Sequence, residues 1–122
     1  MAPIRVLIAD DHLLFAEALQ AILDTDERFQ VVGLARDGRQ AVDLARVDEP
    51  DVVLMDIAMP VMDGFEAAEE LTGNGGPAVL MLTGSNARAD VDRARTSGAA
   101  GYVTKDRIAS ELIDAILEVV SR

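Results

Sequence analysis

Short apolar runs that alternate with segments of helical length predict an α/β fold built on one parallel sheet. Five runs are apolar enough to be strands, and they span residues 4–9, 29–35, 51–55, 78–82 and 100–104. The second, third and fourth runs are apolar at nearly every position, which is typical of strands that are covered on both faces. Strict alternation of strand and helix implies right-handed crossovers with helices on both faces of the sheet. We therefore expect a flavodoxin-like doubly wound (βα)5 domain with a five-stranded parallel sheet in the order 2-1-3-4-5.

The segments between the strands carry helical patterns and end signals. One apolar stripe consists of Phe15, Leu19, Ile22 and Leu23, and the last one of Ile108, Leu112, Ile113, Ile116 and Val120. Asp37 and Asp63 each precede a glycine and suit a helix entry, and Gly98 suits a helix exit. The segment 86–98 differs, because Val91 is its only large apolar residue. We expect a helix there that is weakly anchored to the core.

Composition and charge describe one acidic domain. The chain has 122 residues, of which 50% are hydrophobic, and this suffices for a single core. Its 22 acidic and 11 basic residues give a net charge of −11, which repels nucleic-acid phosphates and anionic membrane surfaces. The chain has no cysteine, and no apolar run approaches the ~20 residues of a membrane span. We expect a cytoplasmic domain that contacts neither a membrane nor DNA directly.

Side chains that can carry chemistry follow the ends of the predicted strands. Asp10 and Asp11 follow the first strand, Asp56 the third, Thr83 the fourth and Lys105 the fifth. Because the carboxyl ends of parallel strands meet at one edge of the sheet, we expect these side chains to converge. Three carboxylates in one cleft require a cation, and ligation by oxygen alone favours Mg²⁺ or Mn²⁺ over zinc. A carboxylate beside such a metal can attack phosphorus, and Asp56 is the best candidate because it stands alone after the central strand.

Each of these residues also has a simpler interpretation. The simpler roles are helix capping for Asp10 and Asp11, turn formation for Asp56 and Thr83, and a solvated charge for Lys105. Tyr102 could be an ordinary packing residue, because aromatic side chains on outer strands often are. We interpret His12 as a surface residue in the first helical turn rather than as a ligand.

Four motifs together resemble the receiver (REC) domain of bacterial two-component response regulators. The motifs ADDH, VVLMDIAMPVMDG, MLTG and GAAGYVTKD occur in this order, and the resemblance covers essentially all of residues 1–122. The forms DDH and GAAGY are similar to receivers that precede LuxR/NarL-type helix-turn-helix domains. The resemblance implies that a sensor histidine kinase phosphorylates Asp56 in a magnesium-dependent reaction and that the domain then switches conformation to control transcription. It also implies a signalling domain rather than a conventional enzyme, one that catalyses its own phosphorylation from a donor and its own dephosphorylation.

The same resemblance implies roles for individual residues. The implied metal ligands are Asp10, Asp11, Asp56 and the backbone carbonyl of Ala58. Of the first two, Asp11 would bind the metal directly and Asp10 largely through water. Thr83 and Lys105 would contact the phosphoryl group, and Tyr102 would be the aromatic switch residue that changes rotamer as Thr83 moves inward.

The resemblance also implies further partners and leaves alternatives open. Regulators of this subfamily usually continue into a DNA-binding domain, so we expect DNA contact only through a C-terminal domain that is absent from this chain. A complete single-domain regulator is the alternative. Two phosphorylated copies could form a homodimer through the first and last helices or through the fourth.

Three other functions bear on the same residues. A haloacid-dehalogenase-type phosphatase needs an acid at the position of Ala58, so the sequence argues against this function. A flavin-binding module of the same fold is also disfavoured, because Asp10 and Asp11 would repel a flavin phosphate. A degenerate receiver that works without phosphorylation is the strongest alternative, because the sequence does not measure reactivity.

Overall fold

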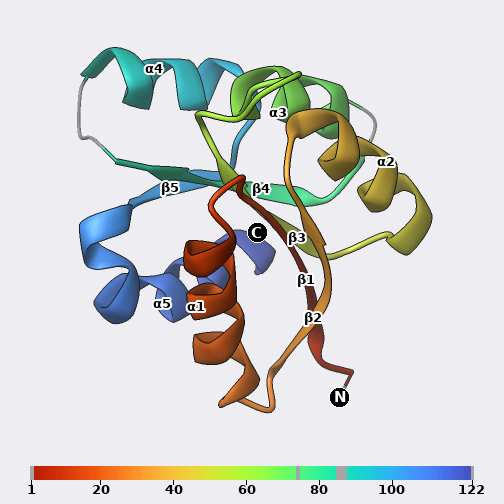
Figure 1. The fold of residues 1–122 in the computed structure, drawn as a ribbon, viewed down its shortest axis with the longest axis vertical. Helices are drawn as coiled ribbons and strands as arrows, with labels where there is room; N and C mark the ends of the chain where they lie inside the picture. The colour runs from red at the N-terminus through yellow and green to blue at the C-terminus, as the bar shows by residue number, and fades with distance from the viewer. Residues whose placement is uncertain (1, 74, 85–87, 122) are drawn as a thin grey trace.

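Five parallel strands form one sheet in the order β2-β1-β3-β4-β5, which confirms the predicted fold class (Figure 1). The computed structural model describes residues 2–73, 75–84 and 88–121. The strands are β1 (Ile4–Ala9), β2 (Phe29–Ala35), β3 (Val52–Asp56), β4 (Ala78–Thr83) and β5 (Gly101–Thr104). The helices are α1 (Leu13–Asp24), α2 (Gly38–Asp48), α3 (Gly64–Thr72), α4 (Arg88–Thr96) and α5 (Ile108–Val120), with a short 3₁₀ turn η1 (Lys105–Arg107).

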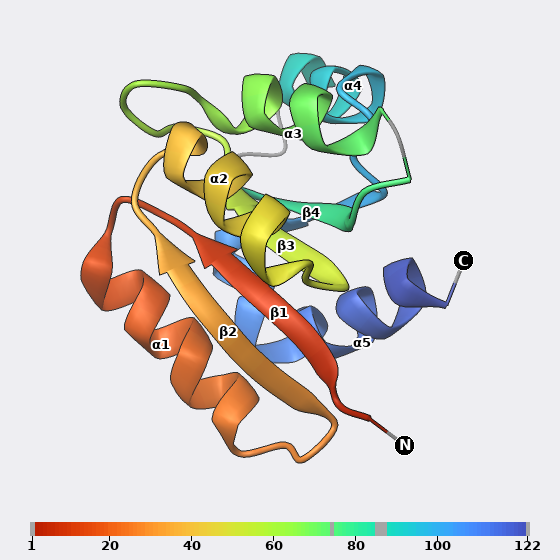
Figure 2. The ribbon, with the colours of Figure 1, turned by 90° about the vertical axis from the view of Figure 1, so that its right-hand side faces the viewer.

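Helices cover both faces of the sheet, with α1 and α5 on one face and α2, α3 and α4 on the other (Figures 1 and 2). Each face has its own apolar core, because neighbouring residues of a strand point to opposite faces. In β3, Val53 packs in the cluster under α2 and α3, whereas Leu54 packs in the cluster under α1 and α5. All five residues of β3 are buried. Burial on both faces explains why every residue of this strand before Asp56 is apolar.

The helix ends follow the predicted signals. Asp37 accepts a hydrogen bond from the Gln40 backbone N–H at 2.8 Å and thereby caps α2. Asp63 accepts one from the Glu66 backbone N–H at 2.9 Å and forms a capping box with it at the start of α3. Gly98, with φ +93°, follows α4 and confirms the predicted helix exit.

Helix α4 is the most thinly packed of the helices. Among its side chains that the structure describes, Ala94 alone is buried and Val91 is half-buried. Arg93 lies over the Phe65 ring at 4.4 Å from its centroid and 4.0 Å from the Asp63 carboxylate, so α4 also contacts α3 through a surface cation. Residues 86 and 87 of the predicted helical segment lie outside the described residues.

Some strand bounds differ from the prediction by one residue. β3 begins at Val52 and includes Asp56, and β4 includes Thr83. The backbone ladder continues through these polar residues because main-chain pairing does not depend on the side chain, whereas the prediction ended each strand with its apolar run. None of the described helices is long and apolar enough to cross a membrane.

Candidate functional site

The strand register places two of the predicted acids side by side. Ala9 of β1 lies opposite Met55 of β3, so the residues that follow them, Asp10 and Asp56, stand level at the carboxyl edge of the sheet. The Asp10 backbone N–H donates to the Ala35 carbonyl at 3.0 Å, which fixes this residue at the end of its strand. Both acids are buried, at 2% and 5% exposure. Carboxylates from distant parts of the chain therefore share one low-dielectric site.

Lys105 joins these two acids. Thr83 of β4 lies opposite Thr104 of β5, and Lys105 follows directly at the same edge. Its ammonium Nζ lies 3.3 Å from Asp10 Oδ2 and 3.3 Å from Asp56 Oδ1. The Lys105 side chain is 26% exposed, so it is not the solvated charge of the simpler interpretation.

The electrostatics of the site favour a further cation. Burial raises the pKa of the Asp56 carboxyl above its ordinary value, and the negative charges of Asp10 and Asp11 raise it further, whereas Lys105 lowers it. One ammonium pairs with Asp10 and Asp56, and Asp11 adds a third negative charge, which leaves excess negative charge around Asp56. Oxygen donors with excess negative charge are the ligands that Mg²⁺ and Mn²⁺ prefer.

Asp10 and Asp11 do not cap α1. The N-cap residue of α1 is His12, and its own side chain makes no capping hydrogen bond. The Asp10 carboxylate accepts a hydrogen bond from the His12 backbone N–H at 2.8 Å, which aims Asp10 across the sheet edge. Ligand atoms of Asp10, Asp11 and His12 lie within 4.8 Å of one another, with Asp11 and His12 exposed. The capping interpretation is therefore wrong, and the exposure predicted for His12 is confirmed.

A tight loop after β3 holds the main chain of Asp56 in place. The Gly64 backbone N–H donates to the Ile57 carbonyl at 2.9 Å, and a Cβ on Gly64 would lie only 2.2 Å from the Asp56 carbonyl oxygen. Val61 has a positive φ of 70° and forms the centre of a γ-turn. Ala58 lies in this loop and is exposed. Only glycine permits so close an approach of α3 to the end of the strand.

Thr83 and Tyr102 occupy different environments at neighbouring strands. Thr83 is buried at 3% exposure at the end of β4, whereas Tyr102 on β5 is 42% exposed. A pocket of about 330 Å³ lies beside Tyr102 and is lined by Val91, Ala94 and Ala99 among others. Tyr102 is thus not an ordinary core aromatic, and room for the side chain lies next to it.

One contact at the site is not predicted by the sequence. Phe15 belongs to an apolar stripe of α1, and its ring centroid lies 4.5 Å from Lys105 Nζ. No feature of the sequence distinguishes Phe15 from the other members of that stripe. The contact follows only from the tertiary packing that brings the start of α1 close to Lys105 at the start of η1.

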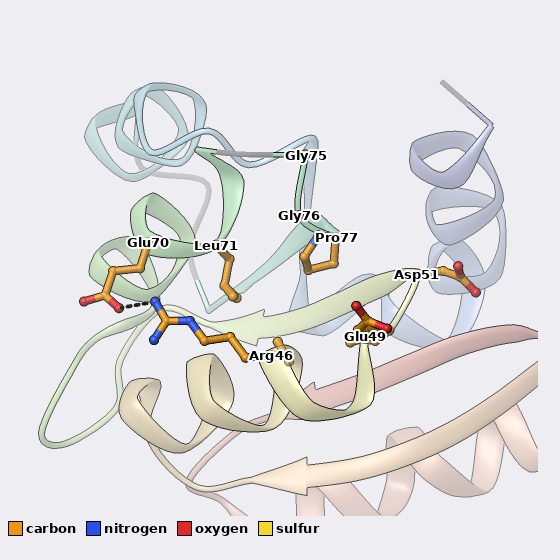
Figure 3. A pocket seen from close by; sticks show the side chains of 10 residues that line it. Arg46, Glu49, Asp51, Glu70, Leu71, Gly75, Gly76 and Pro77 are labelled. Atoms are coloured by element: carbon orange, nitrogen blue, oxygen red, sulfur yellow. Dashed lines mark ion pairs between the residues drawn. The ribbon is translucent and has the colours of Figure 1, made fainter.

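The pocket drawn in Figure 3 lies at the opposite edge of the sheet, where the strands begin. It has a volume of about 620 Å³ and is lined by residues between the end of α2 and the start of β4. Arg46 in its wall lies 3.6 Å from Glu70, so the charges there already pair (Figure 3). None of the predicted site residues lines this pocket.

The fold and the site together define the class of this protein as an α/β signalling domain of the receiver type. The sequence matches the family model described as the response regulator receiver domain over residues 6–117. The chain therefore belongs to this family, and it is a receiver domain of two-component signalling.

Individual relatives agree with this assignment. The transcriptional regulatory protein PdtaR of Mycobacterium tuberculosis is 42% identical over 120 residues, which cover 98% of this chain and 58% of that protein. The signal receiver domain of the putative response regulator NarL from Mycobacterium tuberculosis superimposes with a TM-score of 0.94 at 35% identity and covers 99% of this chain and 98% of that one. CheY of Borrelia burgdorferi, solved as a CheX-CheY-BeF3-Mg²⁺ complex, superimposes with a TM-score of 0.86 at 27% identity. The match covers 96% of this chain and 89% of that one. The chain spans little more than half the length of PdtaR.

Proposed function

We propose that Asp56 accepts a phosphoryl group from the histidine of a sensor kinase in a magnesium-dependent reaction. The observation that carries this proposal is the position of Lys105, whose Nζ lies 3.3 Å from both Asp56 and Asp10. An ammonium there can stabilise charge that develops on a phosphoryl oxygen at Asp56. The role is a signalling one, in which the chain's own groups promote the gain and the loss of the phosphoryl group.

The transfer needs few groups from the protein. An Asp56 carboxylate oxygen forms a bond to phosphorus while the phosphorus–nitrogen bond to the kinase imidazole breaks, and the electron pair of that bond returns to the ring nitrogen. Lys105 and the Thr83 hydroxyl contact the phosphoryl oxygens from the β5 and β4 sides. Water later attacks phosphorus, the bond between phosphorus and the Asp56 oxygen breaks, and the carboxylate and inorganic phosphate are the products.

The donor set of this site fits a hard divalent cation. The groups that would hold it are Asp10, Asp11, Asp56 and the backbone carbonyl of Ala58, and Mn²⁺ suits them as Mg²⁺ does. When bound, the ion neutralises the negative charge shared between the carboxylates and the incoming phosphoryl oxygens. Burial and the neighbouring acids together raise the pKa of Asp56, and the unfavourable negative charge that this indicates supports the assignment, as does the Mg²⁺ of the related CheY complex.

Intact-mass analysis with acetyl phosphate and Mg²⁺ tests the proposal. We expect one added phosphoryl group, which disappears with Asp56→Asn and with excess EDTA. Asp24→Asn is the matched control, because Asp24 is an exposed carboxylate at the far end of α1. Absence of an adduct on the unaltered chain, both with acetyl phosphate and with a cognate kinase, would favour the degenerate receiver instead.

The output of the switch would pass through Thr83 and Tyr102. We infer that Thr83 moves toward the phosphoryl group and that Tyr102 turns into the space beside α4, which changes the α4–β5 surface. The consequences would be pairing of two copies in the cytoplasm and DNA control through a C-terminal domain that is not in this chain. Tyr102→Ala should then keep phosphoryl uptake but lose any phosphorylation-dependent dimer in light scattering. A dimer that persists in Tyr102→Ala would contradict this role.

A further inference from the structure

Lys105 has a third partner that the phosphoryl chemistry does not use. Its Nζ lies 4.5 Å from the centre of the Phe15 ring, in addition to its contacts with Asp10 and Asp56. The face of an aromatic ring is electronegative and attracts an ammonium group at this distance. Phe15 itself packs against the apolar cluster between the sheet and the α1–α5 layer, so the core holds the ring in place.

We propose that Phe15 is a positioning residue that holds the Lys105 ammonium between Asp10 and Asp56 and thereby sets the rate at which Asp56 takes up a phosphoryl group. This inference rests on the proposed function of Asp56. It adds to that function a residue on α1 that touches neither the phosphoryl group nor the cation.

A lysine at this site needs such a contact. Its ammonium sits at the end of a flexible four-carbon stem, and 26% of the Lys105 side chain is exposed, so water competes for it. A carboxylate in the place of Phe15 would anchor the ammonium but would also compete with the phosphoryl oxygens for its N–H groups. The ring restrains the ammonium without adding negative charge to a site that already has three carboxylates.

The ring contact also does not depend on the state of Asp56. Phosphorylation changes the charge and shape of the Asp56 side chain, whereas Phe15 stays fixed on α1 by its apolar packing. Lys105 therefore keeps one anchor throughout the reaction.

Substitution of the ring separates this role from ordinary packing. Phe15→Leu keeps an apolar side chain but removes the ring face, and we expect phosphoryl uptake from acetyl phosphate to slow about threefold to tenfold. Phe15→Tyr keeps the ring and should retain the wild-type rate. Phe29→Leu is the matched control, because Phe29 lies in the same apolar cluster with the Arg28 cation 5.6 Å from its ring, at the opposite edge of the sheet. Thermal unfolding of each variant shows that it is folded.

Two further measurements report on the contact itself. Protons next to a ring face resonate upfield, so the ε-methylene protons of Lys105 should be shifted upfield in the wild type and in Phe15→Tyr but not in Phe15→Leu. In a Lys105→Ala background, Phe15→Leu should have no additional effect on phosphoryl uptake, because its partner is gone.

The outcomes are distinct. Any of four results would overturn the inference while leaving phosphorylation of Asp56 intact. The first two are a wild-type rate in Phe15→Leu and a loss of rate in Phe29→Leu equal to that in Phe15→Leu. The other two are a loss in Phe15→Tyr as large as in Phe15→Leu and a Phe15→Leu effect that persists without Lys105. Absence of phosphoryl uptake by the wild type would overturn the proposed function and, with it, the rate-setting role of Phe15. The upfield shift of Lys105 would still show whether the contact exists.

Discussion

Removal of the Lys105 ammonium should destabilise the metal-free domain in a pH-dependent way. Lys105→Met keeps most of the apolar stem and deletes the one charge that lies between Asp10 and Asp56. The two buried carboxylates would then face each other without a cation. We expect a lower free energy of unfolding at neutral pH.

The geometry gives the scale of this loss. Both carboxylate oxygens lie 3.3 Å from Nζ, so they are at most twice 3.3 Å, or 6.6 Å, apart. At an effective dielectric constant of about 20, two like charges at that separation repel by about 2.5 kcal/mol, and each attraction to the ammonium is about 5 kcal/mol. Two effects offset much of the lost attraction. The variant avoids the cost of desolvating an ammonium group, and water already weakens the attraction in the wild type because Lys105 is partly exposed. We expect a net loss of about 2–4 kcal/mol.

The sign of the pH dependence follows from Asp56. Its pKa is raised above the ordinary value of 3.8 in the folded domain, so between the two pKa values the folded state binds more protons than the unfolded state. Stability therefore falls as the pH rises through that window and is regained as the pH is lowered. Because Lys105 lowers the pKa of Asp56, its removal widens the window. The deficit of Lys105→Met should be largest near neutral pH and smaller in acid.

Urea denaturation with EDTA at about pH 7 and at about pH 4.5 measures both effects. Arg107→Met is the matched control, because Arg107 forms an exposed pair with Glu111 at 3.4 Å and its removal should cost less than about 1 kcal/mol. Equal stability of Lys105→Met and wild type at neutral pH, or a deficit that does not change with pH, would refute the electrostatic account.

Three other substitutions test separate features of the structure. Asp56→Asn should raise the melting temperature of the metal-free domain by at least about 2 °C near neutral pH, since it removes a buried charge, and an unchanged value in differential scanning calorimetry would contradict this. Gly64→Ala should lower the free energy of unfolding in urea by about 1–3 kcal/mol and slow phosphoryl uptake, because its Cβ would lie 2.2 Å from the Asp56 carbonyl oxygen. Gly73→Ala is the control and should be nearly neutral, because a Cβ there would have nothing within 4 Å. Asp26 should titrate by carboxyl NMR with a pKa of about 2, because Arg28 donates hydrogen bonds to it, and Arg28→Ala should return the pKa toward 3.8.

Local patterns in the sequence predicted the strands and the helix ends well. The apolar runs located all five strands to within one residue, because strands that are buried on both faces must be apolar along their length. Asp37 and Asp63 marked the starts of α2 and α3, because helix capping is an interaction between residues three positions apart. The strand ends that were missed, at Asp56 and Thr83, are those where the backbone ladder extends past the apolar residues, and β3 and β5 each begin one residue later than predicted.

The candidate site could be predicted as a set of residues but not as a geometry. The strand order placed Asp10, Asp56 and Lys105 at one edge of the sheet, and the structure confirms that they meet there. The burial of Asp10 and the exposure of Asp11 were not predictable, because neighbouring residues at a strand end point in directions that the following helix decides.

Three features can be read from the order of the residues alone: the fold class, the positions of the strands, and the identity of the acids and the lysine at the sheet edge. These features depend on local periodicity and on the rule that parallel strands end together. The bridge of one ammonium between Asp10 and Asp56, and the contact of that ammonium with the Phe15 ring, become visible only in the folded chain. Contacts of this kind join the residue that follows β1 with residues of α1, β3 and η1, and their distances depend on how these elements pack, which no local pattern records.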